Sequence, residues 1–376
     1  MKNRLFFLLI VTYMLFLTGC WDVVELEDRA FVLGIALDKA EKEEDIVVTY
    51  QIALPSQMFG ENPGGGEKVK NISTVAPNII RANRQILTRI DKVLNIEHLQ
   101  VILIGEELAR DGFYKHIDLF FRDINVRRKT NVLITEGKAA DYFEITPLTA
   151  LSASQYISDI MRLNESRVHQ VSSAVDILKL AISIREGRDY FITKVSKAEK
   201  DVVVSGAAVF KSNKMIGWLD ADEAGKAKWL INDLTAATII LQDVNGIQGQ
   251  VVFEVQNSRT RIKPVVRGEQ VEFDVNIRTE GIVVERENVN FNVSEKADFI
   301  HELEESIEAK IRRDCMEIFE AAQKKYETDF LNLGHLVQLY NVRWWEKNEK
   351  QWERIFKDAK LNLNVDAYIR GVGLTE

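Results

Sequence analysis

Short apolar runs alternate with helical stripes along the first half of the chain. Residues 30–37 and 46–54 predict a strand hairpin, because each run is mainly apolar and a charged segment, residues 41–45, separates them. A stripe through Ile79, Ala82 and Ile86 to Leu94 has helical spacing and follows a proline, which suits a first helical turn. Buried strands are expected at 100–104 and 131–135, and helices at 106–121, 149–163 and 172–186. This alternation predicts a mixed sheet with parallel pairs, covered by helices.

Strands and helices are segregated in the second half. Residues 202–210 and 215–219 predict a hairpin around a polar turn, residues 211–214. Strict alternation of Val271, Phe273, Val275 and Ile277 with polar residues is typical of a half-buried strand. The other expected elements are strands at 249–256, 260–266 and 361–369 and helices at 221–233, 294–327, 330–340 and 343–356. We expect an antiparallel sheet with a long helix here, so the fold class is α+β.

The length of 376 residues allows about two domains at roughly 150 residues each. Residues 194–200 are charged and poor in apolar side chains, and they are the predicted linker. The expected domains are an N-terminal α/β-type domain at 20–195, which could itself divide in two, and a C-terminal α+β domain at 201–376. Residues 55–70 contain three consecutive glycines and are expected to form a surface loop.

Residues 1–19 have the pattern of an export signal. Lys2 and Arg4 precede an apolar run from Leu5 to Leu17 that only Thr12 interrupts. About 13 residues are too few to cross roughly 30 Å of hydrocarbon as a helix, which favours a cleaved signal over a permanent anchor.

The end of this run has the form of a bacterial lipobox, Leu17-Thr18-Gly19-Cys20. Small residues before the cut let the backbone enter a peptidase, and the Cys20 thiol can accept a diacylglyceryl group. Acyl chains contribute roughly 0.8 kcal/mol per buried CH₂, and two chains suffice for stable attachment. We therefore predict a lipoprotein that is anchored at Cys20 to the outer face of a membrane. A signal peptide in which Cys20 has no such role is the alternative.

Composition and charge exclude several classes of protein. Hydrophobic residues make up 46% of the chain and charged residues 28%, as in ordinary globular proteins. The net charge of −8 becomes about −10 when Lys2 and Arg4 leave with the signal, so neither nucleic acid nor an anionic membrane is an expected electrostatic partner. Two cysteines cannot form a disulfide scaffold. Cys315 lies in an apolar helical stripe and is predicted to be a core residue.

No catalytic or cofactor motif is present in the sequence. The glycines at 64–66 lack the Gly-Lys-Ser/Thr of a P-loop, and neither a dinucleotide-binding fingerprint nor a nucleophile elbow occurs. His301 and Glu305 have the spacing of two metal ligands but lack a second histidine, so a solvated helix face is preferred. We expect no enzyme activity, no metal and no cofactor.

A cluster of tryptophans near the C-terminus has two interpretations. Trp345, Trp352 and Phe356 lie seven and four residues apart, which places them on one face of a single helix. Packing against the core is the preferred interpretation. A cage for a cationic ligand is the alternative, because aromatic faces attract cations.

Several segments resemble the Ger(x)C proteins, the lipoprotein C subunits of bacterial spore germinant receptors. The resemblance begins at Gly19-Cys20-Trp21-Asp22-Val23-Val24-Glu25-Leu26 and the strand that ends at Asp38, and it covers essentially all of the mature chain. It recurs at Ser205–Phe210, at Met215–Leu219 with its Gly-Trp-Leu, and at Trp352–Gly371.

The resemblance implies a non-enzymatic subunit outside the spore inner membrane, acting in spore germination with a multispanning A-type and a transporter-like B-type subunit. Cys20 carries over as the lipidated residue, and no catalytic residue carries over. Trp21, Asp22 and Glu25 lie next to the anchor and are expected to face partner subunits. Separately, Gly206 and Gly217 are expected where strands approach closely, and Trp218 is expected to anchor the hairpin.

Two functions remain open at this point. The preferred one is an interaction subunit of a germinant receptor. The alternative is a solute-binding lipoprotein that captures a small nutrient itself and passes it to a membrane partner. A solute-binding lipoprotein typically has a cleft between two similar domains, whereas the two halves of this chain differ in pattern. The sequence leaves direct small-molecule binding undecided.

Overall fold

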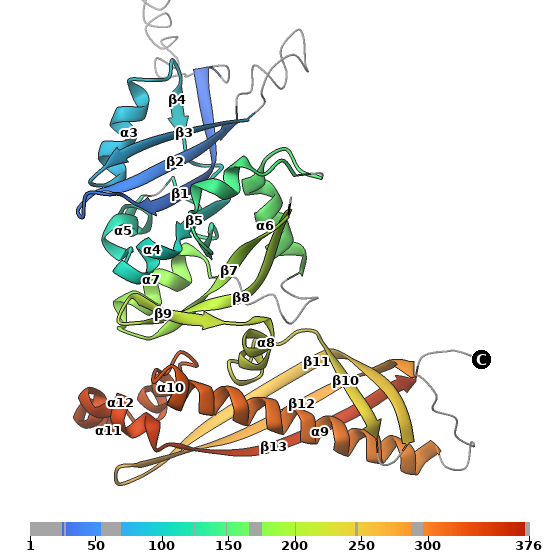
Figure 1. Ribbon diagram of the computed structural model, residues 1–376. Coiled ribbons are helices and arrows are strands. Elements are labelled where there is room, and N and C mark those ends of the chain that lie inside the picture. Colours follow the sequence, from blue (N-terminus) through green and yellow to red (C-terminus); the bar gives the residue numbers. More distant parts are fainter. Residues whose placement is uncertain are drawn as a thin grey trace, which may run out of the picture.

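A computed structural model of the chain describes residue 25 and residues 28–53, 69–123, 125–147, 149–164, 175–199, 201–244, 247–286 and 296–372. Within these residues, strands form two sheets, which we call the upper sheet and the lower sheet (Figure 1). The upper sheet carries helices on both faces, and a long helix runs along the lower sheet. The α+β class with a mixed first sheet is confirmed.

The upper sheet has nine strands in the described chain, ordered β3-β2-β1-β5-β6-β7-β8-β9 with β4 paired to β1. Its centre is parallel, from β1 through β5 and β6 to β7, and hairpins extend it antiparallel at both ends. The strands are β1 (Arg29–Lys39), β2 (Ile46–Ala53), β3 (Val69–Ala76), β4 (Val93–Asn95), β5 (Val101–Gly105), β6 (Asn131–Thr135), β7 (Tyr190–Ala198), β8 (Asp201–Lys211) and β9 (Lys214–Leu219). The predicted parallel pairs are confirmed.

Both faces of the central strands β1, β5 and β6 are buried, which explains their apolar runs. In β5, Ile102 and Ile104 point into one core, and Val101 and Leu103 point into another on the opposite face. The first face is covered by α3 (Ile79–Leu87), α4 (Glu106–Asp111), α5 (Tyr114–Arg122) and α7 (Ile177–Arg185). The second is covered by the 3₁₀ helix η2 (Ala140–Glu144) and α6 (Ala153–Asn164).

The lower sheet is ordered β10-β11-β12-β13 and packs one face on a long helix. Val271, Phe273, Val275 and Ile277 are all buried on that face, as their alternation predicts. The elements are β10 (Ala237–Val244), β11 (Ile247–Arg267), β12 (Gln270–Arg286), β13 (Lys360–Val372), α8 (Ala221–Leu230), α9 (Lys296–Glu320), a π-helical turn η3 (Ala321–Lys325), α10 (Leu333–Tyr340), α11 (Val342–Asn348), a 3₁₀ turn η4 (Glu349–Gln351) and α12 (Trp352–Lys357).

Cys315 is fully buried on α9, as its stripe predicts. Burial raises the pKa of its thiol, and the neighbouring Asp314 adds to the effect. A neutral, inaccessible thiol has no nucleophilic role, so Cys315 is a packing residue.

The pairings differ from the prediction at three places. β13 runs parallel to β12, because α9 to α12 form a crossover that returns the chain to the same end of the sheet. The runs expected at 249–256 and 260–266 form one strand, β11, which stays paired to β12 across two register shifts, between Val252 and Phe253 and between Val255 and Asn257. The stretch expected as a linker lies largely in β7, which is hydrogen bonded to β8, so the upper sheet continues through it.

Helix boundaries differ where a local conformation ends the helix. The helix expected at 106–121 is interrupted at Gly112, whose φ of +101° is incompatible with a right-handed helix. The stripe after Pro77 is helical only to Leu87, and its last residues form β4. The helix expected at 343–356 is divided into α11, η4 and α12. Helices α6 and α7 each begin a few residues later than expected.

Strand β13 is an edge strand whose outward backbone groups are bonded by side chains of α9. Ala367 N–H donates to Glu308 Oε1 over 3.1 Å, and Ile369 N–H donates to Glu304 Oε1 over 2.8 Å. Arg312 donates to the Val365 carbonyl at 3.4 Å. Unpaired edges promote association with other strands, so this cover protects the sheet.

Replacing Glu308 with alanine should lower the free energy of unfolding by about 1–2 kcal/mol, because the Ala367 N–H loses its acceptor. Urea unfolding measures this loss. Glu305→Ala is the matched control, because Glu305 is on the same helix and 66% exposed, and it should change stability by less than about 0.5 kcal/mol. Equal losses in the two variants would show that Glu308 does not protect the edge.

Candidate functional site

The residues predicted to act at the membrane lie mostly outside the described part of the chain. Cys20, Trp21 and Asp22 fall in the undescribed N-terminal segment, and Glu25 is described and exposed. No helix in the described ranges is long and apolar enough to span a bilayer. The lipid anchor and the partner-facing residues therefore stay predictions.

Among the described residues, no group of three or more His, Cys, Asp or Glu side chains is arranged to hold a metal ion. His301 and Glu305 lie one turn apart on α9, with 74% and 66% of their side chains exposed. This is the solvated helix face that the sequence favours.

The two glycines of the β8–β9 hairpin allow the close approaches expected of them. A Cβ at Gly206, where φ is +73°, would lie 2.6 Å from the Leu219 carbonyl oxygen, and one at Gly217 would lie 3.2 Å from the Tyr326 ring. Trp218 is half-buried: its indole N–H donates to Glu106 and Lys194 lies over its ring. The hairpin thus packs tightly at the base of the upper sheet.

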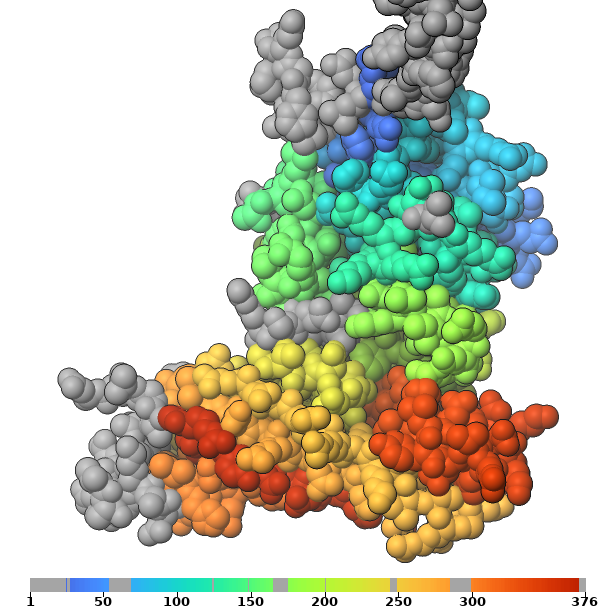
Figure 2. Space-filling view, turned by 180° about the vertical axis from the view of Figure 1, so that it is seen from behind, coloured from blue at the N-terminus to red at the C-terminus, as the bar shows by residue number. Residues whose placement is uncertain are grey.

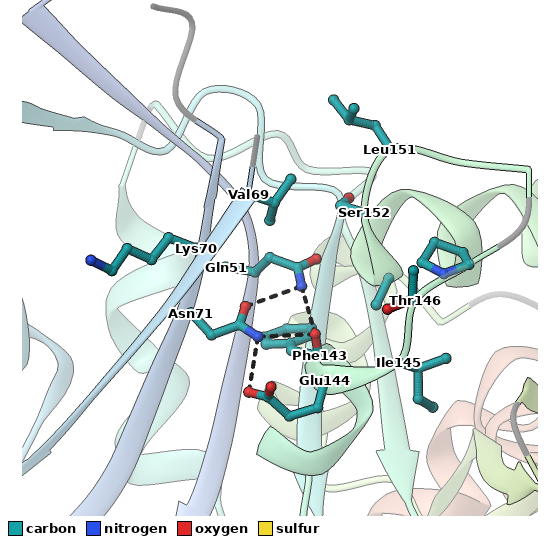
Figure 3. Close-up of a pocket in the computed structure, with 12 residues that line it drawn as sticks. Gln51, Val69, Lys70, Asn71, Phe143, Glu144, Ile145, Thr146, Leu151 and Ser152 are labelled. Atoms are coloured by element: carbon teal, nitrogen blue, oxygen red, sulfur yellow. Dashed lines mark hydrogen bonds between the residues drawn. The ribbon is translucent and has the colours of Figure 1, made fainter. Parts of the chain in front are cut away.

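A groove of about 590 Å³ lies beside the outer strands of the upper sheet (Figure 3). Gln51 of β2 and Asn71 of β3 form its floor, and residues 143–147 and 151–153 form its far wall. The Gln51 amide donates to Asn71 Oδ1 at 3.1 Å and to the Phe143 carbonyl at 3.2 Å, and Asn71 donates to the same carbonyl and to Glu144. The amides on the floor are therefore bonded within the protein.

These amides hold the η2–α6 segment against the sheet, together with a buried carboxyl group. Asp38 of β1 accepts from the Ala139 N–H at 2.6 Å and from the Ala140 N–H at 2.9 Å, at the start of η2. Burial raises the pKa of Asp38, and the two backbone donors oppose this rise. Gln51 Oε1 also accepts from Ser154 N–H in α6. The polar floor thus has a structural role, and the groove gives no catalytic arrangement.

A second region of interest is the contact between the two sheets, which we call the joint (Figures 1 and 2). On the upper side it is formed by the turn 186–189 and strands β7–β9. On the lower side it is formed by residues 326–335 and helices α10–α12. Phe191 and Phe330 meet edge to face with centroids 6.0 Å apart, and Tyr326 OH donates to the Trp218 carbonyl at 2.7 Å. Lys211 bonds Glu353 at 2.6 Å, and Asp189 accepts from Ser212 N–H and Thr328 OH. The joint is both apolar and polar, so it fixes the lower sheet to the upper one.

A cavity of about 150 Å³, which we call the joint cavity, lies at the joint. One wall is the turn before β7, and the other is formed by the start of α10 and by η4 with its flanking tryptophans. Its lining includes Glu186, Arg188, Asp189, Asp329, Asn332, His335, Trp345, Glu349 and Trp352. Arg188 and Asn332 also line a neighbouring cavity of about 310 Å³.

Two buried polar atoms of the joint cavity are unsatisfied. Among the described residues, four buried side-chain polar atoms lack a hydrogen-bonding partner, and two of these are Arg188 Nε and Asn332 Oδ1. An unsatisfied buried polar atom costs about 1–3 kcal/mol. Their occurrence in one cavity marks it as a candidate binding site.

Asp329 organises the wall formed by α10. Its carboxylate accepts from Leu333 N–H at 3.0 Å, Gly334 N–H at 2.6 Å and the Trp352 indole at 3.1 Å. Burial nevertheless raises the pKa of Asp329 to about 7, against these donors, and nearby Asp189 raises it further. The carboxyl group is therefore poised to titrate near neutral pH.

The tryptophans pack against the core of the lower sheet but also reach the cavity. Trp345 and Trp352 have ring centroids 5.3 Å apart, Trp352 and Phe356 5.9 Å apart, and Phe356 is fully buried. Both tryptophans are partly buried against the lower core and line the joint cavity. The preferred packing role of the tryptophans is confirmed. The sequence analysis missed Arg188, Asp329 and Asn332, because nothing in their local pattern separates them from other surface residues.

Two models of protein families together match nearly the whole chain. A profile described as "Spore germination protein N-terminal domain" matches residues 22–197, and one described as "Spore germination B3/ GerAC like, C-terminal" matches residues 205–373.

Curated relatives match over their full length. Spore germination protein B3 of Bacillus subtilis is 27% identical over 381 residues, covering 99% of each chain. Spore germination protein KC of the same organism is 24% identical and covers 99% of this chain and 97% of the relative. A crystal structure of the GerBC protein has a TM-score of 0.61 and 23% identity, and covers 93% of this chain and 100% of that one, which shows a common fold.

Proposed function

The chain belongs to the spore germination B3/GerAC-like family, and on this premise we propose that it is a lipid-anchored, non-enzymatic subunit of a nutrient germinant receptor. The observation that carries the proposal is the match to spore germination proteins over their full length. The lipobox at Cys20 supports the anchor.

Its proposed partners are an A-type multispanning subunit and a B-type transporter-like subunit in the spore inner membrane. A lipid on Cys20 would hold the folded part at the outer face of that membrane, or of the cell membrane during sporulation. Trp21, Asp22 and Glu25 follow the anchor directly, and we propose that they face these subunits. In this role the protein needs no catalytic residue or cofactor.

Cys20→Ala tests the anchor. The variant should fold but leave the membrane fraction, and spores that carry it should germinate poorly on nutrients, because two acyl chains provide the attachment. Fractionation, acyl labelling and a germination assay measure these effects. Gly19→Ala is the matched control, because a small residue before the cut preserves processing. If Cys20→Ala stayed in the membrane fraction, the lipid anchor would be rejected.

The alternative function, direct capture of a small nutrient, is favoured by one observation, the unsatisfied polar atoms of the joint cavity. Capture of this kind is compatible with a receptor subunit, so the two functions do not exclude each other.

A further inference from the structure

We propose that the outer face of the lower sheet binds the phosphomonoester group of a small soluble molecule, held by Arg259, Arg261 and Arg278. These side chains line a hollow of about 420 Å³, which we call the arginine hollow. Its other lining residues are Asn257, Asn276, Thr279, Glu280 and Asp366. The inference rests on this lining and is independent of the proposed receptor role. Only the choice of a soluble molecule over a lipid uses the predicted anchor.

The pairing of β11 with β12 brings the three arginines together. Arg259 lies directly opposite Arg278 in the register, and Arg261 follows two residues later on the same face of β11. The alternate residues Thr260 and Ile277 are buried on the inner face, so the arginines point outward, and all three are exposed. Directly opposite residues have Cβ atoms roughly 5 Å apart. The three guanidinium groups can therefore reach one ligand.

The positive charge of this cluster is not neutralised by its surroundings. Arg259 and Arg278 face each other across the strand pair, and like charges placed in this way are destabilising. Among the described residues, no carboxylate lies within ion-pair distance of Arg259 or Arg261. Arg278 stacks on the Tyr368 ring, 4.9 Å from its centroid. Stacking uses the face of the guanidinium group and leaves its in-plane N–H donors for a ligand.

The two carboxylates of the lining leave a surplus of positive charge. Glu280 is already engaged, because it accepts from Arg370 Nε at 2.8 Å and from Asn257 Nδ2 at 3.3 Å. These two donors hold the pKa of Glu280 below its ordinary value. Asp366 lies beside Arg278 in the register of β12 and β13, but it forms no ion pair within the described chain. With Arg370 included, four arginines face two carboxylates, which leaves two positive charges for a ligand.

The number of donors favours a phosphoryl group over a carboxylate. A phosphomonoester has three terminal oxygens and carries close to two negative charges at neutral pH. Guanidinium groups match the oxygens of phosphate and of carboxylate equally well. A carboxylate, however, has two oxygens and a single charge, so it would leave one of the three arginines without an acceptor. A dianion with three oxygens suits both the surplus charge and the three arginines.

The place of the arginine hollow favours a soluble molecule over a lipid. In Figure 1 the lower sheet lies at the opposite end of the molecule from β4 and the start of β1. The predicted anchor, Cys20, shortly precedes β1 in the sequence. A membrane at the anchored end would therefore lie far from the hollow, which is open to water on the outer face of the sheet.

Calorimetric titration of the full chain in neutral detergent micelles, at constant ionic strength, tests the site. Inorganic phosphate and glycerol 3-phosphate should bind saturably at millimolar or lower concentration, and each should raise the unfolding temperature. Glycerol should not bind, and acetate and malonate should bind at least about tenfold more weakly than phosphate. Absence of saturable binding of both phosphates, or equal binding of malonate, would overturn the proposal.

Phosphatidic acid added to the micelles tests the source of the phosphoryl group. This lipid carries a phosphomonoester, but it should not displace glycerol 3-phosphate at equal concentration. Displacement would assign the arginine hollow to a lipid headgroup and would overturn the soluble molecule.

Arg259→Gln separates binding from folding. It removes one of the two facing like charges, so the unfolding temperature without ligand should stay level or rise, while phosphate affinity falls at least about tenfold. Arg261→Gln should weaken binding similarly. Arg267→Gln, at the exposed end of the same strand and outside the hollow, is the matched control and should bind phosphate like the parent chain. Equal phosphate affinity in Arg259→Gln and in the control would overturn the assignment.

Discussion

Replacing Phe330 with alanine is expected to lower the free energy of unfolding by about 3–5 kcal/mol, as for other fully buried aromatic residues. Phe330 has no exposed surface, and its ring meets Phe191 and Tyr326 edge to face at centroid distances of 6.0 and 5.6 Å. Phe191 belongs to the upper sheet, so the deletion would leave a cavity at the joint itself. Urea unfolding, followed by circular dichroism, gives the size of the loss.

Tyr340→Ala is the control for this prediction. Tyr340 is also aromatic and close in sequence, but it is 62% exposed at the end of α10. Its replacement should change stability by less than about 0.5 kcal/mol. A Phe330→Ala loss no greater than that of the control would mean that the joint does not depend on this ring.

Stability is expected to fall as the pH rises through neutrality, because of Asp329. Its pKa is about 7 in the folded protein, against an ordinary value of 3.8 for an unfolded chain. The folded state therefore holds this proton more tightly than the unfolded state does. The resulting contribution of Asp329 to the free energy of unfolding is fully present below pH 3.8 and is lost as the pH rises through 7. Between pH 5 and pH 8 the loss amounts to about 2–3 kcal/mol.

Asp329→Asn isolates this contribution from that of the other carboxyl groups. The amide cannot ionise, so the variant should not show this loss of stability. Between pH 5 and pH 8, its unfolding free energy relative to that of the parent chain should therefore rise by about 2–3 kcal/mol. Urea unfolding at several pH values measures the difference. A difference independent of pH would show that Asp329 is already ionised at pH 5.

The sequence predicts elements best where burial imposes a simple pattern. Residues 131–135 lie in the middle of the upper sheet, and their apolar run 132–134 is buried on both faces, so the predicted bounds match β6. The alternation at 271–277 likewise indicates the buried face of β12. Strand β3 was missed because Lys70, Asn71, Ser73 and Thr74 make its sequence polar, as an edge strand permits. Its place depends on hydrogen bonds to β2, which no local pattern records.

The joint cavity could not be predicted from the sequence, and the reason differs from that for β3. Arg188 and Asn332 are far apart in the chain, and each is unremarkable in its own segment. Whether a polar atom is buried without a partner depends on how two distant segments pack. The tryptophan pair gave the only signal, because its spacing indicates packing and its rings allow a ligand.

The hydrophobic core of the lower sheet contains residues from both of the matched domains. Phe191 of β7, Ala207 and Val209 of β8 and Leu219 of β9 are buried in the same cluster as α9 and β12. A fragment that begins at residue 205 would lack β7, and a fragment that ends at residue 197 would lack β8 and β9. We therefore expect the two halves to unfold together in one cooperative transition, although their sequences are recognised separately.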